Sequence, residues 1–546
     1  MEKRFVKMLI FCMTCLVSHT VFAYDFEVDG IRYNIVSINN LTCEVVPNSY
    51  SGNIYIPTYV QYNGRKLKVV GIGENAFNGC SSISSVILPD QLEYIKNKAF
   101  KGCSSLKELR IPKTLKEIGL SFDGCSLQKV YINNVAGWCS ISFDEDNYGR
   151  ASKPINSNTV FYVNEKPCET LQIPQSVTII KPHVFEDINT IRKVVFPSSI
   201  KRIENSAFSG CKNIESMALP YKCEYIGAWA FSSCPLTNYL LIPAAVDTIG
   251  AYAFNKCHLD HLLFEEGVKE IKISSHVFGK VKQLTIRRNI KLWSSTYWID
   301  KIDSLEDVTI SPKVTSLPSG IFKNFTGIKN VTIEDGDTEL KTPGYSYSPD
   351  DTSARSVDYG EFHNSPVNYL YLGRNISYPL FGWNHRGSSS YDKPSVKTLI
   401  IGDNVESYFK DSYYKYGLNV YIGLNTLDLG KKFNYIQDMS KSDSLERIII
   451  RNPVPPIAEG FANTTYLHCK LFVPKGCVNK FKSANIWKNF WNISEIDESV
   501  LGIETDEIIS NEFCRYTIDG TQITSPQRGI NIVKMSDGTT KKVLVK

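Results

Sequence analysis

The densest group of metal-binding residue types in the sequence is Cys257-His258-Leu259-Asp260-His261. Thiolate, imidazole and carboxylate groups are the usual protein ligands of zinc and related ions. Leu259 and Leu262, however, take the apolar positions of a segment patterned as a strand, which turns His258 and Asp260 toward solvent. No C-x-x-C pair occurs after residue 23. We therefore expect neither a metal site nor a cofactor.

Other chemical motifs are equally weak. Glu334-Asp335-Gly336-Asp337 has the acidic composition of a calcium loop but matches no complete ligand pattern. The sequence contains eight histidines and lacks H-E-x-x-H, G-x-S-x-G and the phosphate-binding glycine loop. A pair of carboxylates for glycoside hydrolysis cannot be singled out among so many acidic residues. We expect a non-enzymatic protein.

Two segments that interrupt the regular pattern are better candidates for binding. Residues 344–366 and 378–395 combine aromatic side chains with Ser, Asn and Gly, a composition typical of adaptable recognition loops. The alternative is that they are tolerated insertions whose tyrosines pack locally. The candidate contact residues, for an extracellular protein or glycan ligand, are Tyr345, Tyr347, Tyr359, Trp383, His385 and Arg386.

These segments interrupt a repeat of about 23 residues with the pattern I-x-x-x-A-F-x-G-C-x-x-L-x-x-[VL]-x-[IL]-P. A fixed period of this length indicates a solenoid. Alternating aliphatics such as Leu109 and Ile111 predict a half-buried strand that ends at Pro112, which has no amide to donate. We expect one continuous parallel sheet of about 14 coils from about Val70 to Asn452. The repeated phenylalanines, expected in one buried column, include Phe77, Phe100, Phe122, Phe185, Phe208, Phe231, Phe254 and Phe278.

One cysteine recurs at the same position of the repeat. A redox or metal column is one interpretation, but a small buried residue that fills a corner fits better, because free cysteine is among the most buried residue types. Cys469 and Cys477 lie outside this column, and whether they form a disulfide stays open. The column consists of Cys80, Cys103, Cys125, Cys211, Cys234 and Cys257.

The first 23 residues have the charged start, the apolar run and the small-residue end of a secretory signal peptide. The mature chain is expected to begin at Tyr24, without a lipid anchor. The formal charge of +5 falls to +3 on cleavage, because three basic residues and one acidic residue are removed. That balance favours neither nucleic acid nor a membrane surface, and no later segment has the length of a transmembrane helix.

The A-F-x-G-C unit followed by a strand ending in I-P resembles the BspA-like bacterial leucine-rich-repeat proteins, over roughly residues 24–496. Residues 24–70, with the turn dipeptides Asp29-Gly30 and Asn63-Gly64, resemble the β-hairpin cap of that family. The segment around Trp138-Cys139 resembles a longer variant repeat, and residues 469–497 resemble a closing cap. The resemblance implies a β-rich solenoid of leucine-rich repeats on a surface protein of Bacteroidetes.

The predicted organisation has five parts: a signal peptide (1–23), the β cap (24–70), a regular array (71–290), a looser array with inserted loops and closing cap (291–496), and a β tail (497–546). In the looser array the strand ending changes to Leu372-Gly373, Ile401-Gly402 and Leu429-Gly430. The tail resembles the sorting domains of type IX secretion, and a cap for the last coil is the alternative.

Three functions fit these observations. The resemblance and the export signal favour an exported adhesin or interaction scaffold at the cell surface or in the medium, with the periplasm as the alternative location. A glycan-binding or glycan-processing envelope protein is the second hypothesis. A purely structural envelope component is the third.

Overall fold

The computed structural model describes residues 23–293, 297–342, 345–346, 357–359, 361–362, 364–377, 380–381, 383–384, 395–406, 418, 421, 423–497, 512–517, 522–523, 528–535 and 540–545. These form two compact units, Met1–Cys168 and Glu169–Lys546. Both are β-solenoid, with about 18 turns between them rather than the 14 predicted. The array exceeds the prediction because strands already stack from residue 52 and continue to residue 495. The signal peptide lies outside the described residues, apart from Ala23.

Unit 1 opens with the two predicted hairpins. β1 (Phe26–Val28) and β2 (Ile31–Ser37) pair antiparallel, as do β5 (Tyr59–Tyr62) and β6 (Arg65–Ile72). Both turns have positive φ, 51° and 77° at Asp29-Gly30 and 47° and 72° at Asn63-Gly64, as a tight hairpin with right-handed strand twist requires. β6 also pairs in parallel with the strand of the first coil, so the cap covers an edge that would otherwise be open.

The coils of unit 1 contribute short parallel strands to two faces. One face holds β4 (Gly52–Tyr55), β7 (Ile83–Ile87), β9 (Glu108–Arg110), β11 (Lys129–Ile132) and β13 (Val160–Val163), the last extended by β14 (Lys166–Pro167). The other holds β3 (Thr42–Val45), β6, β8 (Tyr94–Ile95), β10 (Glu117–Ile118) and β12 (Ser142–Phe143). Helix α2 (Val135–Cys139) lies in the variant repeat, and the Asn134 side chain accepts a hydrogen bond from the Gly137 amide at its start.

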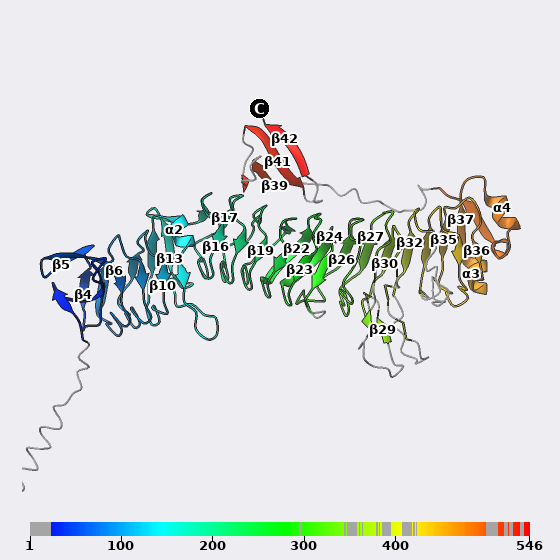
Figure 1. The fold of residues 1–546 in the computed structure, drawn as a ribbon. Helices are drawn as coiled ribbons and strands as arrows, with labels where there is room; N and C mark the ends of the chain where they lie inside the picture. The colour runs from blue at the N-terminus through cyan, green and yellow to red at the C-terminus, as the bar shows by residue number, and fades with distance from the viewer. Residues whose placement is uncertain are drawn as a thin grey trace, which may run out of the picture. The chain divides into compact units, whose positions relative to one another are not determined.

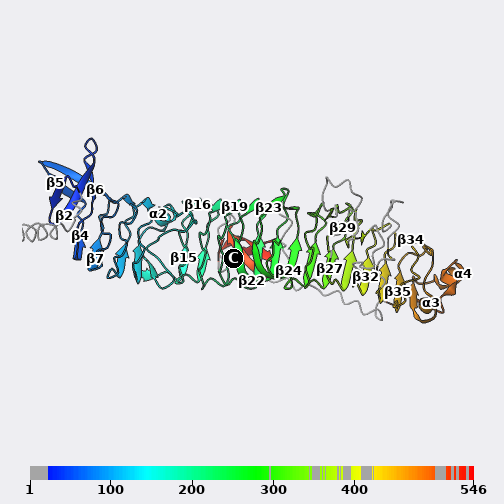
Figure 2. The ribbon, with the colours of Figure 1, turned by 90° about the horizontal axis from the view of Figure 1, so that it is seen from below.

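Unit 2 repeats this plan with more strands (Figures 1 and 2). Its largest sheet has eleven strands, all paired in parallel. They are β20 (Tyr239–Ile242), β22 (Phe254–Phe264), β24 (Phe278–Ile286), β26 (Asp307–Ile310), β27 (Asn330–Ile333), β30 (Tyr369–Leu372), β32 (Thr398–Ile401), β33 (Thr426–Leu429), β35 (Arg447–Ile450), β37 (Lys470–Val473) and β38 (Asn492–Glu495). A second face carries β16 (Ile179–Ile180), β18 (Arg202–Ile203), β19 (Tyr225–Ile226), β21 (Thr248–Ile249), β23 (Ile271–Ile273) and β25 (Ile290–Leu292).

The prediction of one continuous sheet is wrong. β15 (Thr170–Gln172) pairs with β17 (Lys193–Val195) in a separate two-stranded sheet, and the next coil, through residues 214–221, has no strand. β34 (Tyr435–Ile436) and β36 (Ile457–Ala458) form another small pair. The cause is strand length, since each coil contributes only a few ladder bonds before a proline or glycine ends the strand. One irregular coil then suffices to interrupt the sheet.

The predicted phenylalanine column is confirmed within each unit. In unit 1, the ring centroids of Phe77, Phe100 and Phe122 follow one another at 5.1 and 5.2 Å. In unit 2, successive rings from Phe185 to Phe278 lie 5.1 to 5.5 Å apart, with interplanar angles of 15° or less. All are buried. The rings therefore fix the spacing between coils by direct contact.

Five cysteines of the column are buried and Cys125 is half-buried, and all six thiols are free. The structure adds a role that the sequence does not predict. Each of five thiols donates a hydrogen bond to the carbonyl of the phenylalanine one coil earlier, as Cys103 does to Phe77 at 3.2 Å and Cys211 to Phe185 at 3.0 Å. Each of these carbonyls also accepts a backbone amide of its own coil, as Phe77 does from Cys80 at 3.0 Å, so the thiol adds a second hydrogen bond that joins neighbouring coils. Cys469 and Cys477 are free thiols as well, so no disulfide joins them.

Beyond residue 290 the coils stay in the same sheet, and they lengthen between residues 333 and 429. Leu372 pairs with Ile401, and Ile401 with Leu429, which gives coils of 29 and 28 residues as the glycine spacing predicted. The glycines allow close stacking, since a Cβ on Gly430 would lie 2.2 Å from the carbonyl oxygen of Gly402. The predicted looser array is therefore a continuation of the solenoid.

The tail forms a four-stranded antiparallel sheet in the order β40 (Gln522–Ile523), β39 (Glu512–Thr517), β41 (Gly529–Met535) and β42 (Thr540–Val545). This is the small β-unit that the sequence predicts. The sequence has two further Asp-Gly dipeptides in the tail, at 519–520 and 537–538, and both fall outside the described residues. No helix among the described residues is long and apolar enough to cross a membrane.

Candidate functional site

The first inserted loop and part of the second build a separate three-stranded sheet from β28 (Tyr345–Ser346), β29 (Val357–Tyr359) and β31 (Trp383–Asn384). Tyr345 is the register partner of Tyr359, and Trp383 is the partner of Asp358. The backbone thus pairs two of the six candidate contact residues, Tyr345 and Tyr359, whereas Trp383 takes the alternate register position beside Asp358. The other three, Tyr347, His385 and Arg386, lie outside the described residues.

A second candidate surface lies on the strand face of unit 1, where alternate residues point away from the core. We call these residues the tyrosine row. Cross-strand register pairs Tyr55 with Ile87, and it aligns Arg110, Tyr131 and Tyr162 with one another. Tyr55 and Ile87 are 65% and 57% exposed, and as register partners they form one apolar patch. The row consists of Tyr55, Ile87, Arg110, Tyr131 and Tyr162.

Contacts within the tyrosine row hold its side chains in place. The rings of Tyr131 and Tyr162 stack at 4.5 Å, and the Arg110 guanidinium lies 4.3 Å from the Tyr131 centroid. Arg110 also forms a two-point ion pair with Glu165, with 3.0 Å between Nη2 and Oε2. Hydrogen bonding from Arg110 lowers the pKa of the Glu165 carboxyl, so that the pair is charged at neutral pH. The row presents oriented aromatic and cationic groups.

The sequence pattern contained a signal for the tyrosine row that we did not use. Its members occupy the variable position between the two aliphatics that precede the strand end, as Arg110 does between Leu109 and Ile111. This position faces outward in each coil. This position gives no signal within a single coil, because its residues form a row only when neighbouring coils stack.

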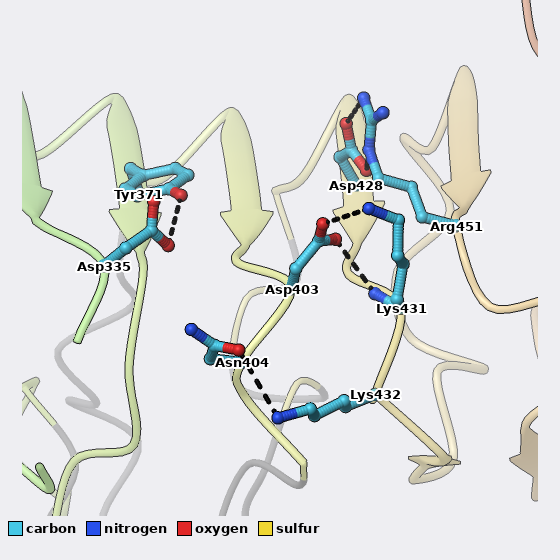
Figure 3. A network of polar contacts seen from close by, with 8 residues as sticks. All are labelled: Asp335, Tyr371, Asp403, Asn404, Asp428, Lys431, Lys432 and Arg451. Atoms are coloured by element: carbon cyan, nitrogen blue, oxygen red, sulfur yellow. Dashed lines mark hydrogen bonds and ion pairs between the residues drawn. The ribbon is translucent and has the colours of Figure 1, made fainter. Parts of the chain in front are cut away.

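In unit 2 the corresponding face carries the polar row shown in Figure 3, defined as Asp335, Tyr371, Asp403, Asp428, Lys431 and Arg451. The Tyr371 hydroxyl donates to Asp335 at 2.8 Å, and Lys431 pairs with Asp403 at 2.6 Å. Burial alone would raise the pKa of Asp403, but the hydrogen bonds and charge of Lys431 outweigh it and hold that pKa below its usual range. Such a carboxylate is unsuited to donate a proton at neutral pH.

Asp428 is the most buried member of the polar row, at 1% exposure. It lies on β33 between Ile400 and Ile449, and Arg451 holds both its oxygens at 2.8 Å. A buried carboxylate needs such a partner, since removing one member leaves an uncompensated charge. Alongside it, Lys432 donates to Asn404 at 3.4 Å. The arrangement is suited to fixing the spacing of coils and presenting charge, rather than to proton transfer.

Two buried arginines were missed by the sequence analysis. The guanidinium of Arg288 donates to the carbonyls of Ala244 and Pro243, at 2.8 and 3.0 Å. Arg374 does the same to Pro312 and Ser311, each at 2.9 Å. Burial lowers the pKa of Arg288 to about 10. Both arginines belong to an Arg-Asn-Ile triplet that directly follows the strand turn, and this repeated triplet was the available signal.

The supposed metal ligands have other partners. The Cys257 thiol donates to the Phe231 carbonyl, and His261 Nε2 lies 2.8 Å from the Thr285 hydroxyl. His258 and Asp260 are exposed, as the alternation predicted. Within the described ranges, no group of three or more His, Cys, Asp or Glu residues could hold a metal ion.

Comparison with known proteins agrees with this architecture. Six copies of the BspA type leucine-rich repeat region match residues 68–147, 155–285 and 241–350. Among solved structures, a leucine-rich repeat protein from Bacteroides ovatus is 20% identical, with 87% of this chain and 100% of that chain covered and a TM-score of 0.38. A leucine-rich cell surface protein from Faecalibacterium prausnitzii is 16% identical, with 88% and 96% covered and a TM-score of 0.27.

The pneumococcal vaccine antigen PcpA is 13% identical, with 86% and 98% of the two chains covered and a TM-score of 0.24. No curated protein matches the chain. The repeat match, however, extends over half of the sequence, and the phenylalanine column, the cysteine column and the short parallel strands show the same unit in three dimensions. The chain belongs to the BspA-type leucine-rich-repeat family.

Proposed function

We propose that this protein is an exported, non-enzymatic scaffold that binds an extracellular protein through the strand faces of its solenoid. The observation that carries the proposal is the tyrosine row. Tyrosine and arginine are the residue types that dominate binding energy at protein interfaces. Here Tyr55 and Arg110 are exposed and Tyr131 and Tyr162 are half-buried. Arg110, Tyr131 and Tyr162 are held by their own contacts, so that little ordering entropy is lost on binding.

The polar row supports the same function in a different way. Its exposed ion pair of Asp403 with Lys431 gives the strand face a fixed pattern of charge. Such patterns contribute to the choice of partner and to the rate of association more than to affinity. Export follows from the proposed signal peptide at residues 1–23, and surface delivery would depend on the tail.

The glycan hypothesis keeps one specific observation in its favour. In the inserted sheet Tyr345 is the register partner of Tyr359, and aromatic side chains are common in sugar sites. Hydrolysis is less well supported, because the lowered pKa of Asp403 is opposite to that of a general acid. Glycan binding through the insertion is therefore the second candidate.

The test uses the mature chain, residues 24–546, against immobilised fibronectin, fibrinogen, collagen, mucin and a glycan array. We expect binding to a protein on the panel, and the double variant Tyr55→Ser with Ile87→Ser should lower the affinity at least tenfold. Tyr148→Ser is the matched control, since Tyr148 is 82% exposed but lies outside the row. Equal losses for the two variants, or binding to glycans alone, would contradict the proposal.

A further inference from the structure

The outer face of the eleven-stranded sheet is buried at one end. Leu241, Leu263 and Thr285 are register partners on β20, β22 and β24, and they alternate along their strands with leucines of the core. Their side chains therefore point outward, yet they are only 4%, 0% and 8% exposed. The next two residues of the same row, Thr309 and Thr332, are half-buried. We call Leu241, Leu263 and Thr285 the buried patch.

The side chains beside the buried patch are polar or charged. The Tyr239 ring packs edge-on against His261 at 5.0 Å. Burial, and then the charge of Arg287, lowers the pKa of His261, while Asp307 acts in the opposite direction. Glu265 accepts a backbone amide of the preceding coil at 2.9 Å. An apolar centre with a polar rim is the arrangement of a docking surface, and neighbours within a sheet lie beside an outward side chain rather than above it.

One face of the tail sheet is buried as well. Arg515, Asn531 and Val533 are 8%, 1% and 2% exposed. They share a face, because Arg515 is the register partner of Val533 and its Nη1 donates to Asn531 Oδ1 at 3.2 Å. On the edge strand β42, Val543 is half-buried and Lys541 is exposed. A four-stranded antiparallel sheet is a single layer, so a buried face requires another element packed on it.

The chain between the two sheets is long enough to bring these faces together. In the order of the large sheet, β24 lies eight strand spacings from β38, or about 38 Å at about 4.8 Å per strand. Residues 498–511 connect β38 to the tail, and fourteen residues reach about 46–50 Å when fully extended. The buried patch is therefore within reach of the tail of the same chain.

The last coil is the other surface that the tail could cover, and it is the more exposed of the two. All four residues of β38 are exposed or half-buried. Trp491, directly before that strand, is 76% exposed. A coil covered by the tail would bury such a large apolar side chain. Burial of the outer face is instead complete at Leu263.

We propose that the tail sheet docks on the buried patch within one chain, through the face that carries Arg515 and Val533. The two leucines form the apolar centre of the contact. The contact is small, but the linker keeps the tail at an effective concentration in the millimolar range, so that a weak contact is occupied. A partner that binds this face of the tail has to displace it and uncovers Leu241 and Leu263. The tyrosine row belongs to unit 1, so the proposed protein-binding function does not depend on this contact.

Photo-crosslinking of the mature chain tests the contact. Benzoylphenylalanine replaces Tyr239, at the rim of the buried patch, or Tyr369, the matched control. Both tyrosines are half-buried, and register places them in the same outer row of the large sheet, on β20 and β30. After irradiation, mass spectrometry locates the crosslinked peptides. We expect position 239 to crosslink within the chain to residues 512–545, at a yield at least tenfold above that of position 369.

A shorter linker tests the contact without altering either face. Deletion of residues 501–508 leaves six linker residues, which reach about 20–22 Å and so fall short of the about 38 Å to β24. The yield of the adduct at position 239 should fall at least tenfold, while far-UV circular dichroism stays as in the parent. In the control the same eight residues are replaced by eight Gly and Ser residues, and the yield should stay within twofold.

Leu263→Asp tests the patch itself. A carboxylate at its centre would be buried without a partner when the tail is docked, and it is solvated when the tail is released. The adduct at position 239 should therefore be lost. Thr332→Asp places the same group in the same row at a half-buried position, outside the patch, and should keep the adduct.

Three outcomes would overturn the inference. They are the absence of tail adducts at position 239, equal yields at positions 239 and 369, and a yield that the shortened linker leaves unchanged. Adducts that join two chains, rather than two parts of one, would also contradict it and would assign the patch to a second copy of the protein. None of these outcomes bears on the effect of Tyr55→Ser with Ile87→Ser, so the two proposals fail separately.

Discussion

At the scale of single residues, one ring and one thiol connect each regular coil to the next. Phe208 shows the first contact, with Phe185 at 5.1 Å on one side and Phe231 at 5.3 Å on the other. Its carbonyl also accepts the hydrogen bond from Cys234 at 3.2 Å. The loss of such a residue disturbs three coils at once, because neither neighbour can move toward the gap without leaving its own partner.

Phe208→Ala should therefore lower the free energy of unfolding by about 3–5 kcal/mol. Tyr148→Ala, a change at a largely exposed ring, should cost less than about 1 kcal/mol. Urea unfolding followed by far-UV circular dichroism measures both. Equal shifts for the two variants would mean that the ring column does not support the fold.

His261 predicts how stability depends on pH. Burial, together with the nearby charge of Arg287, lowers the pKa of His261 from 6.5 to about 4. The unfolded chain therefore takes up a proton near pH 6.5, while the folded chain does so only near pH 4. The contribution of neutral His261 to the free energy of unfolding is therefore complete above pH 6.5 and is lost as the pH falls toward 4.

Between pH 7 and pH 4.5 the His261 contribution should fall by about 2–3 kcal/mol. The measurement compares urea unfolding of the parent chain and of His261→Gln at both pH values. The glutamine variant should lose less stability on acidification, because it has no proton to gain at this position. An identical loss in both chains would show that His261 is not responsible.

At the scale of elements, the sequence was most informative where one coil suffices to reveal the pattern. The coil length, the buried phenylalanines and the Asp29-Gly30 and Asn63-Gly64 turns follow from local spacing and turn chemistry. The breaks in the sheet do not follow from local spacing, because they depend on whether two or three ladder hydrogen bonds form in a given coil. The tyrosine row was likewise hidden, since its members become neighbours only after the coils stack.

Gly430 tests how tightly the long coils stack. A methyl group there meets the backbone carbonyl of Gly402, which cannot turn aside as a side chain would. Gly430→Ala should cost about 1–3 kcal/mol by overpacking. Gly423→Ala is the control, because its new methyl group would approach only the flexible end of Lys397, at 3.4 Å. Thermal unfolding of both variants distinguishes close stacking from a general penalty for alanine.

At the scale of the whole molecule, the tail carries the two interpretations that the sequence left open, a sorting domain and a cap. It is an antiparallel sheet with its own strand order, whereas the solenoid strands before it pair in parallel. We propose that this separate sheet is the unit that a transport machine recognises, with a cap for the last coil as the alternative. We expect removal of residues 497–546 to leave a folded solenoid that is retained in the periplasm. The measurement is the accessibility of the full and the truncated chain to protease at the surface of a bacterium with type IX secretion. Equal display of the two chains would leave the tail only a capping role.

The central claim is that the strand face of the solenoid contacts an extracellular protein. Photo-crosslinking tests this claim directly, with benzoylphenylalanine placed at position 55 in the tyrosine row or at position 148 outside it. Both positions are highly exposed, at 65% and 82%, so exposure alone does not distinguish them. After incubation with the matrix protein that the chain binds, position 55 should give a covalent adduct and position 148 should not. Adducts of equal yield at both positions, or at position 148 alone, would contradict the account.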